Sequence, residues 1–204
     1  MEKGAFREKA DIVLASGSPR RKELLGSTGV EFRVIPSIVD EPPADPGETP
    51  GGYAMRMARL KARDVAWGHP GSYVLGADTV VAVGGHILGK PVDAADARRM
   101  LAMLSGREHS VVTGCCLVGP SGEVVWEDAP VSKVTFADVS EEAIAAYVAT
   151  GEPMDKAGGY AIQGLGAFMI EKVEGSYTNV VGLPLSHLLQ TLSSLGALAP
   201  READ

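Results

Sequence analysis

Short apolar segments alternate with helical patterns along the chain, and this alternation limits the folds that the chain can adopt. Residues 11–15 (DIVLA) and 72–75 (SYVL) predict buried strands, and each is followed by a turn of small residues. Further strands are predicted at 31–36, 80–83, 86–88, 108–118, 123–126, 131–139 and 167–173, and further helices at 20–25, 93–104, 140–150 and 184–195. The pattern predicts an α/β fold with a mixed sheet.

A long amphipathic helix is predicted in the first third of the chain. Thr49 is a suitable N-cap and is followed by proline at the first helical position. The helical spacing continues to about Trp67 and places Met57, Leu60 and Val65 near one face. Tyr53 belongs to the same apolar face.

No repeat or low-complexity linker divides the 204 residues. The chain is interpreted as one domain over residues 1–204, with a core at about 11–195 and short flexible ends. A hydrophobic content of 45% excludes disorder for the chain as a whole. No apolar stretch approaches the roughly 18 residues of a membrane helix, and the N-terminal stretch lacks the apolar run of a secretory signal. We expect no association with a membrane.

The charged residues limit the kinds of partner that we expect, and the two cysteines indicate the cellular compartment. A net charge of −7 argues against a general nucleic-acid binder. Residues 1–66 nevertheless hold 11 of the 19 Lys and Arg residues, which fits either a small anionic ligand or a solvated basic face. Cys115 and Cys116 are adjacent and cannot join distant segments, so we predict core residues in a reducing cytoplasm.

The segment SGSPRRKEL joins the first predicted strand to a helix. A strand that leads into a helix N-terminus presents backbone N–H groups and the positive end of the helix dipole to an anion. Ser16 adds a hydroxyl group, and Arg20 and Arg21 add guanidinium groups that match phosphate oxygens. The segment predicts a phosphate site, although an ordinary basic helix start on the surface has the same residues.

Asp78 and Lys90 are further candidates for such a site. Asp78 ends a predicted strand, where α/β sheets place ligands, so it could hold a divalent metal, activate a water or be an ordinary turn residue. Lys90 ends a Gly-x4-Gly-Lys pattern that begins at Gly84, but Pro91 stands where a P-loop has its magnesium-binding Ser or Thr. The P-loop interpretation is rejected, and Lys90 is either a phosphate contact or a surface lysine.

Five short motifs follow one another along the chain: SGSPRR, DE, ADTVV, GKP and DKAGGYAIQG. In this order the sequence resembles the Maf family of nucleoside triphosphate pyrophosphatases over residues 11–192. The resemblance implies a twisted mixed sheet with flanking helices and two lobes around a cleft, as in inosine-triphosphatase-like enzymes. It also implies a divalent cation (Mg²⁺ or Mn²⁺), a homodimer, and cleavage of a nucleotide to its monophosphate and pyrophosphate.

The resemblance also assigns roles to individual residues. The family's proton acceptor falls on Asp78, and Glu41 and Asp78 are the candidate metal ligands. The phosphate-binding and polar positions of the family fall on Ser16, Arg20, Arg21, Glu41, Lys61 and Lys90, and its specificity positions fall on Arg20, Thr79 and Gln163. The segment at 155–164 resembles the branch that acts on dTTP and UTP, since the branch that acts on 7-methyl-GTP has a different segment there.

Two other functions are compatible with these residues. The family has been linked to septum formation, so a nucleotide-binding regulator of cell division without turnover is the alternative to an enzyme. The carboxylates favour the enzyme, because a protein that only binds nucleotides does not need them. An enzyme that removes modified pyrimidine nucleotides would differ only in its preferred base.

Overall fold

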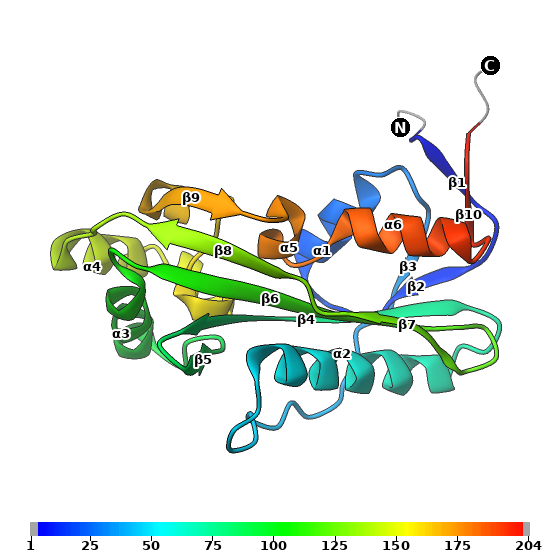
Figure 1. The fold of residues 1–204 in the computed structure, drawn as a ribbon, viewed down its shortest axis with the longest axis horizontal. Helices are drawn as coiled ribbons and strands as arrows, with labels where there is room; N and C mark the ends of the chain where they lie inside the picture. Colours follow the sequence, from blue (N-terminus) through cyan, green and yellow to red (C-terminus); the bar gives the residue numbers. More distant parts are fainter. Residues whose placement is uncertain (1–3, 202–204) are drawn as a thin grey trace.

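A mixed sheet forms the centre of the computed structural model, which describes residues 4–201 (Figure 1). The strands are β1 (Phe6–Glu8), β2 (Ile12–Leu14), β3 (Arg33–Val34), β4 (Tyr73–Val83), β5 (His86–Leu88), β6 (Glu108–Val118), β7 (Val124–Asp128), β8 (Val131–Phe136), β9 (Ile170–Glu174) and β10 (Leu198–Pro200). The helices are α1 (Pro19–Gly26), α2 (Pro50–Trp67), α3 (Ala94–Leu104), α4 (Glu141–Ala149), α5 (Tyr177–Val181) and α6 (Leu185–Ser194), with 3-10 turns at Glu152–Asp155, Ala157–Gly159 and Leu165–Met169.

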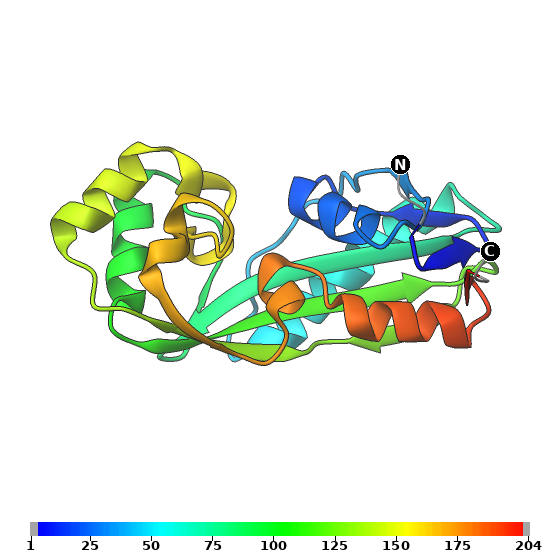
Figure 2. The same ribbon diagram turned by 90° about the horizontal axis from the view of Figure 1, so that it is seen from above.

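The central sheet has the strand order β3-β2-β4-β6-β8-β9, with β5 paired to β4 and β7 paired to β6. Strand β2 runs parallel to β3 and β4, and the other pairs are antiparallel. Helices flank this sheet on both faces (Figures 1 and 2). The predicted α/β class with a mixed sheet is therefore confirmed.

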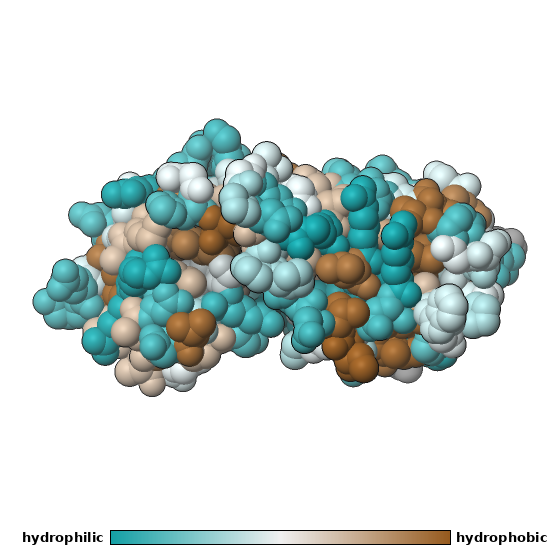
Figure 3. Space-filling view, turned by 90° about the horizontal axis from the view of Figure 1, so that it is seen from below, coloured by the Kyte–Doolittle hydropathy of each residue, from teal (hydrophilic) through white to brown (hydrophobic). Residues whose placement is uncertain are grey.

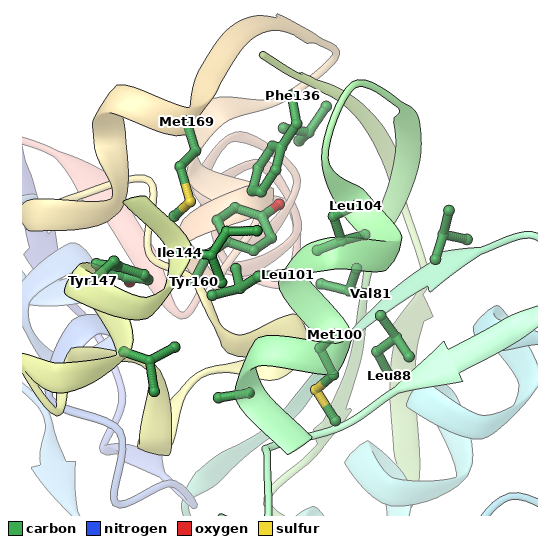
Figure 4. Packing of buried hydrophobic residues seen from close by; sticks show 14 of the residues in the cluster. Val81, Leu88, Met100, Leu101, Leu104, Phe136, Ile144, Tyr147, Tyr160 and Met169 are labelled. Atoms are coloured by element: carbon green, nitrogen blue, oxygen red, sulfur yellow. The ribbon is translucent and has the colours of Figure 1, made fainter. Parts of the chain in front are cut away.

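Two lobes are joined by the long strands β4 and β6, which pass from one lobe into the other (Figure 2). One lobe contains α3 and α4, and the other contains α1, α2 and α6. The core of the α3–α4 lobe is built around Leu101, Leu104, Phe136, Tyr160 and Met169 (Figure 4). The aromatic rings of Phe136 and Tyr160 meet edge to face, with their centroids 4.7 Å apart.

Helix α2 lies directly on the sheet because the strands beneath it carry glycine where the helix crosses them. A Cβ atom on Gly76 of β4 would lie 2.2 Å from the carbonyl oxygen of Ala58, and one on Gly114 of β6 would lie 2.4 Å from the backbone of Ala54. Three alanines, Ala54, Ala58 and Ala62, lie on the buried face of α2, together with the predicted Met57 and Val65. Leu60, which was predicted on that face, is 38% exposed.

Asp78 lies inside a strand, and the prediction that it ends one is wrong. Strand β4 continues through the Gly-Ala-Asp-Thr segment, and its register with β6 is unbroken from Val74 to Ala82. Gly76, which resembles a turn residue in the sequence, instead makes room for α2. Asp78 is thereby held at a fixed position beneath a helix.

The segments near the two chain ends pair with each other. Strands β1 and β10 form an antiparallel pair in which Phe6 lies opposite Pro200. No strands were predicted there, because the sequence analysis placed flexible ends outside the core. Residues 1–3 and 202–204, which those predicted ends include, lie outside the described residues.

Figure 3 shows the face of the molecule on the side of α2, where hydrophilic residues surround apolar patches. The exposed apolar side chains of α2 and of the loop bonded to it include Ile38, Leu60 and Trp67. Within residues 4–201, no helix combines the length and the apolar character that crossing a membrane requires.

Replacing Gly76 with alanine tests the contact between α2 and β4. We expect Gly76→Ala to lower the free energy of unfolding by about 2 kcal/mol, since the new Cβ would overlap backbone that cannot move alone. The matched control is Gly68→Ala at the end of α2, where a Cβ would meet only one atom at 3.9 Å. Urea denaturation measures the free energy of unfolding of each variant. Equal values for the two variants would contradict the close contact.

Candidate active site

A cleft of about 620 Å³ lies between the lobes, along one edge of β4. Strand β4 pairs with β2 only as far as Leu75 and with β5 only from Val81, so the residues between have β6 on one edge and the cleft on the other. Side chains alternate along a strand. Asp78 therefore faces α2, where it contacts Lys61, while Thr79 faces α1 on the opposite side of the sheet.

The cleft brings together all the residues that the sequence analysis selected. These are Ser16, Arg20, Arg21, Glu41, Lys61, Asp78, Thr79, Lys90 and Gln163. They come from six segments of the chain that are far apart in the sequence, so no local feature accounts for their convergence. Tyr53, Asp155 and Lys156 also line the cleft, and the sequence analysis did not select them.

Lys61 stands at the centre of the charged part of the cleft. Its Nζ lies 2.7 Å from Oδ1 of Asp78 and 3.0 Å from Oε1 of Glu41. The side chains of Lys61 and Asp78 are each only 12% exposed, whereas that of Glu41 is 48% exposed. Two carboxylates therefore share one ammonium group and leave oxygen lone pairs for another cation or for a proton.

Glu41 lies in an irregular loop that α2 holds at two points. Arg56 donates to the carboxylate of Glu48 through Nε at 2.9 Å and through a terminal nitrogen at 2.6 Å. This contact lowers the pKa of Glu48 to about 2. Asp64 accepts a hydrogen bond from the hydroxyl of Ser37 at 2.7 Å. The helix that carries Lys61 thus also fixes the loop that carries Glu41.

Arg21 is buried and connects three parts of the cleft wall. Its guanidinium donates to the carbonyl of Gly182 at 2.8 Å, to Oγ of Ser16 at 3.1 Å and to Oγ1 of Thr79 at 2.9 Å. Burial lowers the pKa of Arg21, and the nearby Asp78 carboxylate opposes this shift. Arg21 was predicted to bind phosphate, but three of its N–H groups donate to other residues of the chain. Arg21 therefore organises the cleft wall.

Arg20 reaches across the cleft to the other lobe. Its terminal nitrogens lie 3.3 Å from Oδ2 and 3.3 Å from the backbone oxygen of Asp155, and the ammonium of Lys156 pairs with the same carboxylate. Asp155 and Lys156 belong to the segment DKAGGYAIQG, so that motif was the available signal for them. Lys90 and Gln163 are exposed in the cleft, and neither makes a hydrogen bond with another residue in 4–201.

The two cysteines are core residues, as predicted. Cys115 and Cys116 are unpaired and fully buried in β6. Burial raises the pKa of both thiols to about 12. Neither is a nucleophile at neutral pH, because the thiolate is the reactive form.

Sequence comparison with known proteins shows to which family this chain belongs. A family model described as "Maf-like protein" matches residues 11–195. The chain belongs to this family. The dTTP/UTP pyrophosphatase of Geobacter sulfurreducens is 53% identical over 191 residues, which are 94% of this chain and 100% of that protein. The dTTP/UTP pyrophosphatase of Geotalea uraniireducens is 51% identical, over 95% of this chain and 99% of that protein.

One solved structure is similar to this Maf-like chain at lower identity. It is the crystal structure of a nucleoside-triphosphatase, or dITP/XTP pyrophosphatase, from Mycobacterium abscessus. The two are 23% identical with a TM-score of 0.44, and the match covers 91% of this chain and 94% of that one. The family assignment rests on the sequence matches, which confirm the predicted resemblance.

Arg21 and Lys90 are predicted to differ in their effect on stability. Arg21→Met leaves three protein acceptors without their buried donor, so we expect a loss of about 2–4 kcal/mol in the free energy of unfolding. Lys90→Met removes an exposed cation and is expected to change it by less than about 1 kcal/mol. Urea denaturation of both variants checks this, and a stable Arg21→Met protein would contradict the organising role.

Proposed function

We propose that this chain hydrolyses dTTP and UTP to the nucleoside monophosphate and pyrophosphate. The observation that carries the proposal is the cleft in which Asp78, Glu41 and several cations converge. A triphosphate is a polyanion, and Arg20, Lys61 and Lys90 provide positive charge for its oxygens. The dTTP/UTP pyrophosphatases that share about half of their residues with this chain support the same substrate class.

Asp78 is the proposed proton acceptor for a water that attacks the α-phosphorus. Its carboxylate faces the cleft, and the ion pair with Lys61 holds it in one orientation. As the water's oxygen bonds to the α-phosphorus, its proton passes to Asp78 and the bond to the β-phosphate oxygen breaks. Pyrophosphate leaves, and Arg20 and Lys90 offset the negative charge that it carries.

Glu41 and Asp78 suit a hard divalent cation, because both present carboxylate oxygens at one point of the cleft. Within residues 4–201 no group of three His, Cys, Asp or Glu side chains could hold a metal. Magnesium is often bound by one or two carboxylates together with substrate phosphates, and we propose Mg²⁺ or Mn²⁺ here. The cation, when bound, supplies positive charge that offsets the charge of the phosphates.

Base selection is proposed to involve Gln163, Thr79 and the loop at 157–166. The amide of Gln163 can meet the N3–H and a carbonyl oxygen of uracil or thymine with one acceptor and one donor. The loop lies close to β4: a Cβ on Gly158 would lie 2.9 Å from the side chain of Val81. Gly158 also has a φ of 69°, which favours glycine. A homodimer and a cytoplasmic location stay predictions.

The products formed from dTTP test the proposal. Incubation with dTTP, UTP, dCTP and 7-methyl-GTP in the presence of Mg²⁺ or Mn²⁺ should give dTMP and pyrophosphate as the first products from dTTP. Chromatography of early time points identifies them. First products of dTDP and orthophosphate would contradict the proposal. Tight binding of dTTP without turnover would favour the regulator of cell division instead.

Asp78→Asn tests the assigned proton acceptor. The substitution keeps the shape of the side chain and removes its charge, so we expect kcat for dTTP to fall about a hundredfold or more, with the protein still folded. Asp138→Asn is the matched control, since Asp138 is exposed and does not line the cleft. Pyrophosphate release measures kcat, and an Asp78→Asn enzyme within threefold of the parent would refute the role.

A further inference from the structure

A chain of hydrogen bonds runs from Arg21 through two threonines to a backbone carbonyl. Arg21 donates to Oγ1 of Thr79 at 2.9 Å, and Oγ1 of Thr79 lies 2.9 Å from Oγ1 of Thr113. The Thr113 hydroxyl then donates to the backbone oxygen of Asn179 at 2.9 Å. The chain connects α1 to α5 across strands β4 and β6.

The direction of this chain is determined at both ends. A guanidinium can only donate and a carbonyl oxygen can only accept. The single hydroxyl proton of Thr113 is used on Asn179, so Thr113 can only accept from Thr79. The hydroxyl proton of Thr79 must therefore point toward Thr113, away from any ligand.

The part of the chain formed by Thr113 and Asn179 is firmly held. Thr113 and Asn179 are completely buried. The side-chain amide of Asn179 donates to the backbone oxygen of Val111 at 3.2 Å and to Oγ of Ser132 at 3.0 Å. The Thr79 hydroxyl cannot turn away without leaving a buried acceptor, Oγ1 of Thr113 or the backbone oxygen of Asn179, without its donor, which is unfavourable.

We propose that Thr113 is a positioning residue that fixes the Thr79 hydroxyl as a hydrogen-bond acceptor, so that this part of the cleft selects a base that donates. The inference rests on the proposed function. Thr79 is half-buried and lines the cleft, whereas Thr113 does not and acts through Thr79. Thr79 therefore offers a ligand its remaining lone pair and no proton.

The chemistry of the pyrimidines supplies the selection. Uracil and thymine carry a proton on N3 and can donate it to the lone pair of Thr79. Cytosine has a lone pair at N3, which would face the lone pair of Thr79. The amide of Gln163 can turn to suit either ring, but the Thr79 hydroxyl cannot. Discrimination against cytosine follows from the fixed hydroxyl.

Thr113→Val tests the proposal with a side chain of similar shape that lacks the hydroxyl. The proton of Thr79 then becomes free to turn toward the cleft and to bond with N3 of cytosine. We expect the ratio of kcat/KM for dTTP to that for dCTP to fall at least about tenfold, because a site loses selectivity when its hydrogen-bonding group can adapt. Pyrophosphate release with each nucleotide measures the ratio.

Thr113→Ser is the rescue variant, since it keeps the hydroxyl, and its ratio should stay within about threefold of the parent's. Thermal unfolding of each variant confirms that it is folded, and Thr113→Ala replaces the valine variant if that protein does not fold. The role of Thr113 would be overturned if the parent is active and the variant without the hydroxyl keeps the parent's ratio. An equal fall in the variant's kcat/KM for both nucleotides would be such a result. A parent that does not hydrolyse dTTP would overturn the proposed function itself.

Discussion

The close contact of helix α2 with the backbone of β4 and β6 determines where the charged groups of the cleft lie. Two glycines permit it, because a Cβ on Gly76 or Gly114 would come within 2.4 Å of the helix backbone. The contact sets Lys61 of the helix against Asp78 of the strand at 2.7 Å. Through Arg56 the same helix also anchors the loop that presents Glu41. One packing contact thereby assembles the charged centre of the cleft.

The alternation of side chains along β4 separates the proposed proton acceptor from the residue proposed to select the base. Asp78 faces α2 and the carboxylate–ammonium cluster, while its neighbour Thr79 faces the buried guanidinium of Arg21. The two neighbours reach the same cleft because, in the described part of the chain, no strand pairs with that edge of β4 between Leu75 and Val81. One short stretch of strand, paired only with β6, therefore serves both the phosphates and the base in the proposed reaction.

Much of the site could be predicted from the sequence, because the motifs carry the polar residues whose convergence the structure shows. The sequence-based prediction was wrong where a residue type that is common in turns lies inside a strand. Gly76 and Asp78 are frequent turn formers, yet here the glycine makes room for a helix inside a strand. Leu60 has the spacing of a buried residue but is 38% exposed, whereas Met57 and Val65 of the same helix are buried. A basic segment also does not reveal that Arg21 is buried while Arg20 reaches the other lobe.

The position of bond cleavage tests the account most directly. The charged centre at Asp78 is proposed to direct water to the α-phosphorus of dTTP, with the cations holding the departing pyrophosphate. Hydrolysis in ¹⁸O-labelled water, followed by mass spectrometry of both products, identifies the phosphorus that is attacked. The account predicts one ¹⁸O atom in dTMP and none in pyrophosphate. Label in pyrophosphate would place the attack on the β-phosphorus and contradict the account.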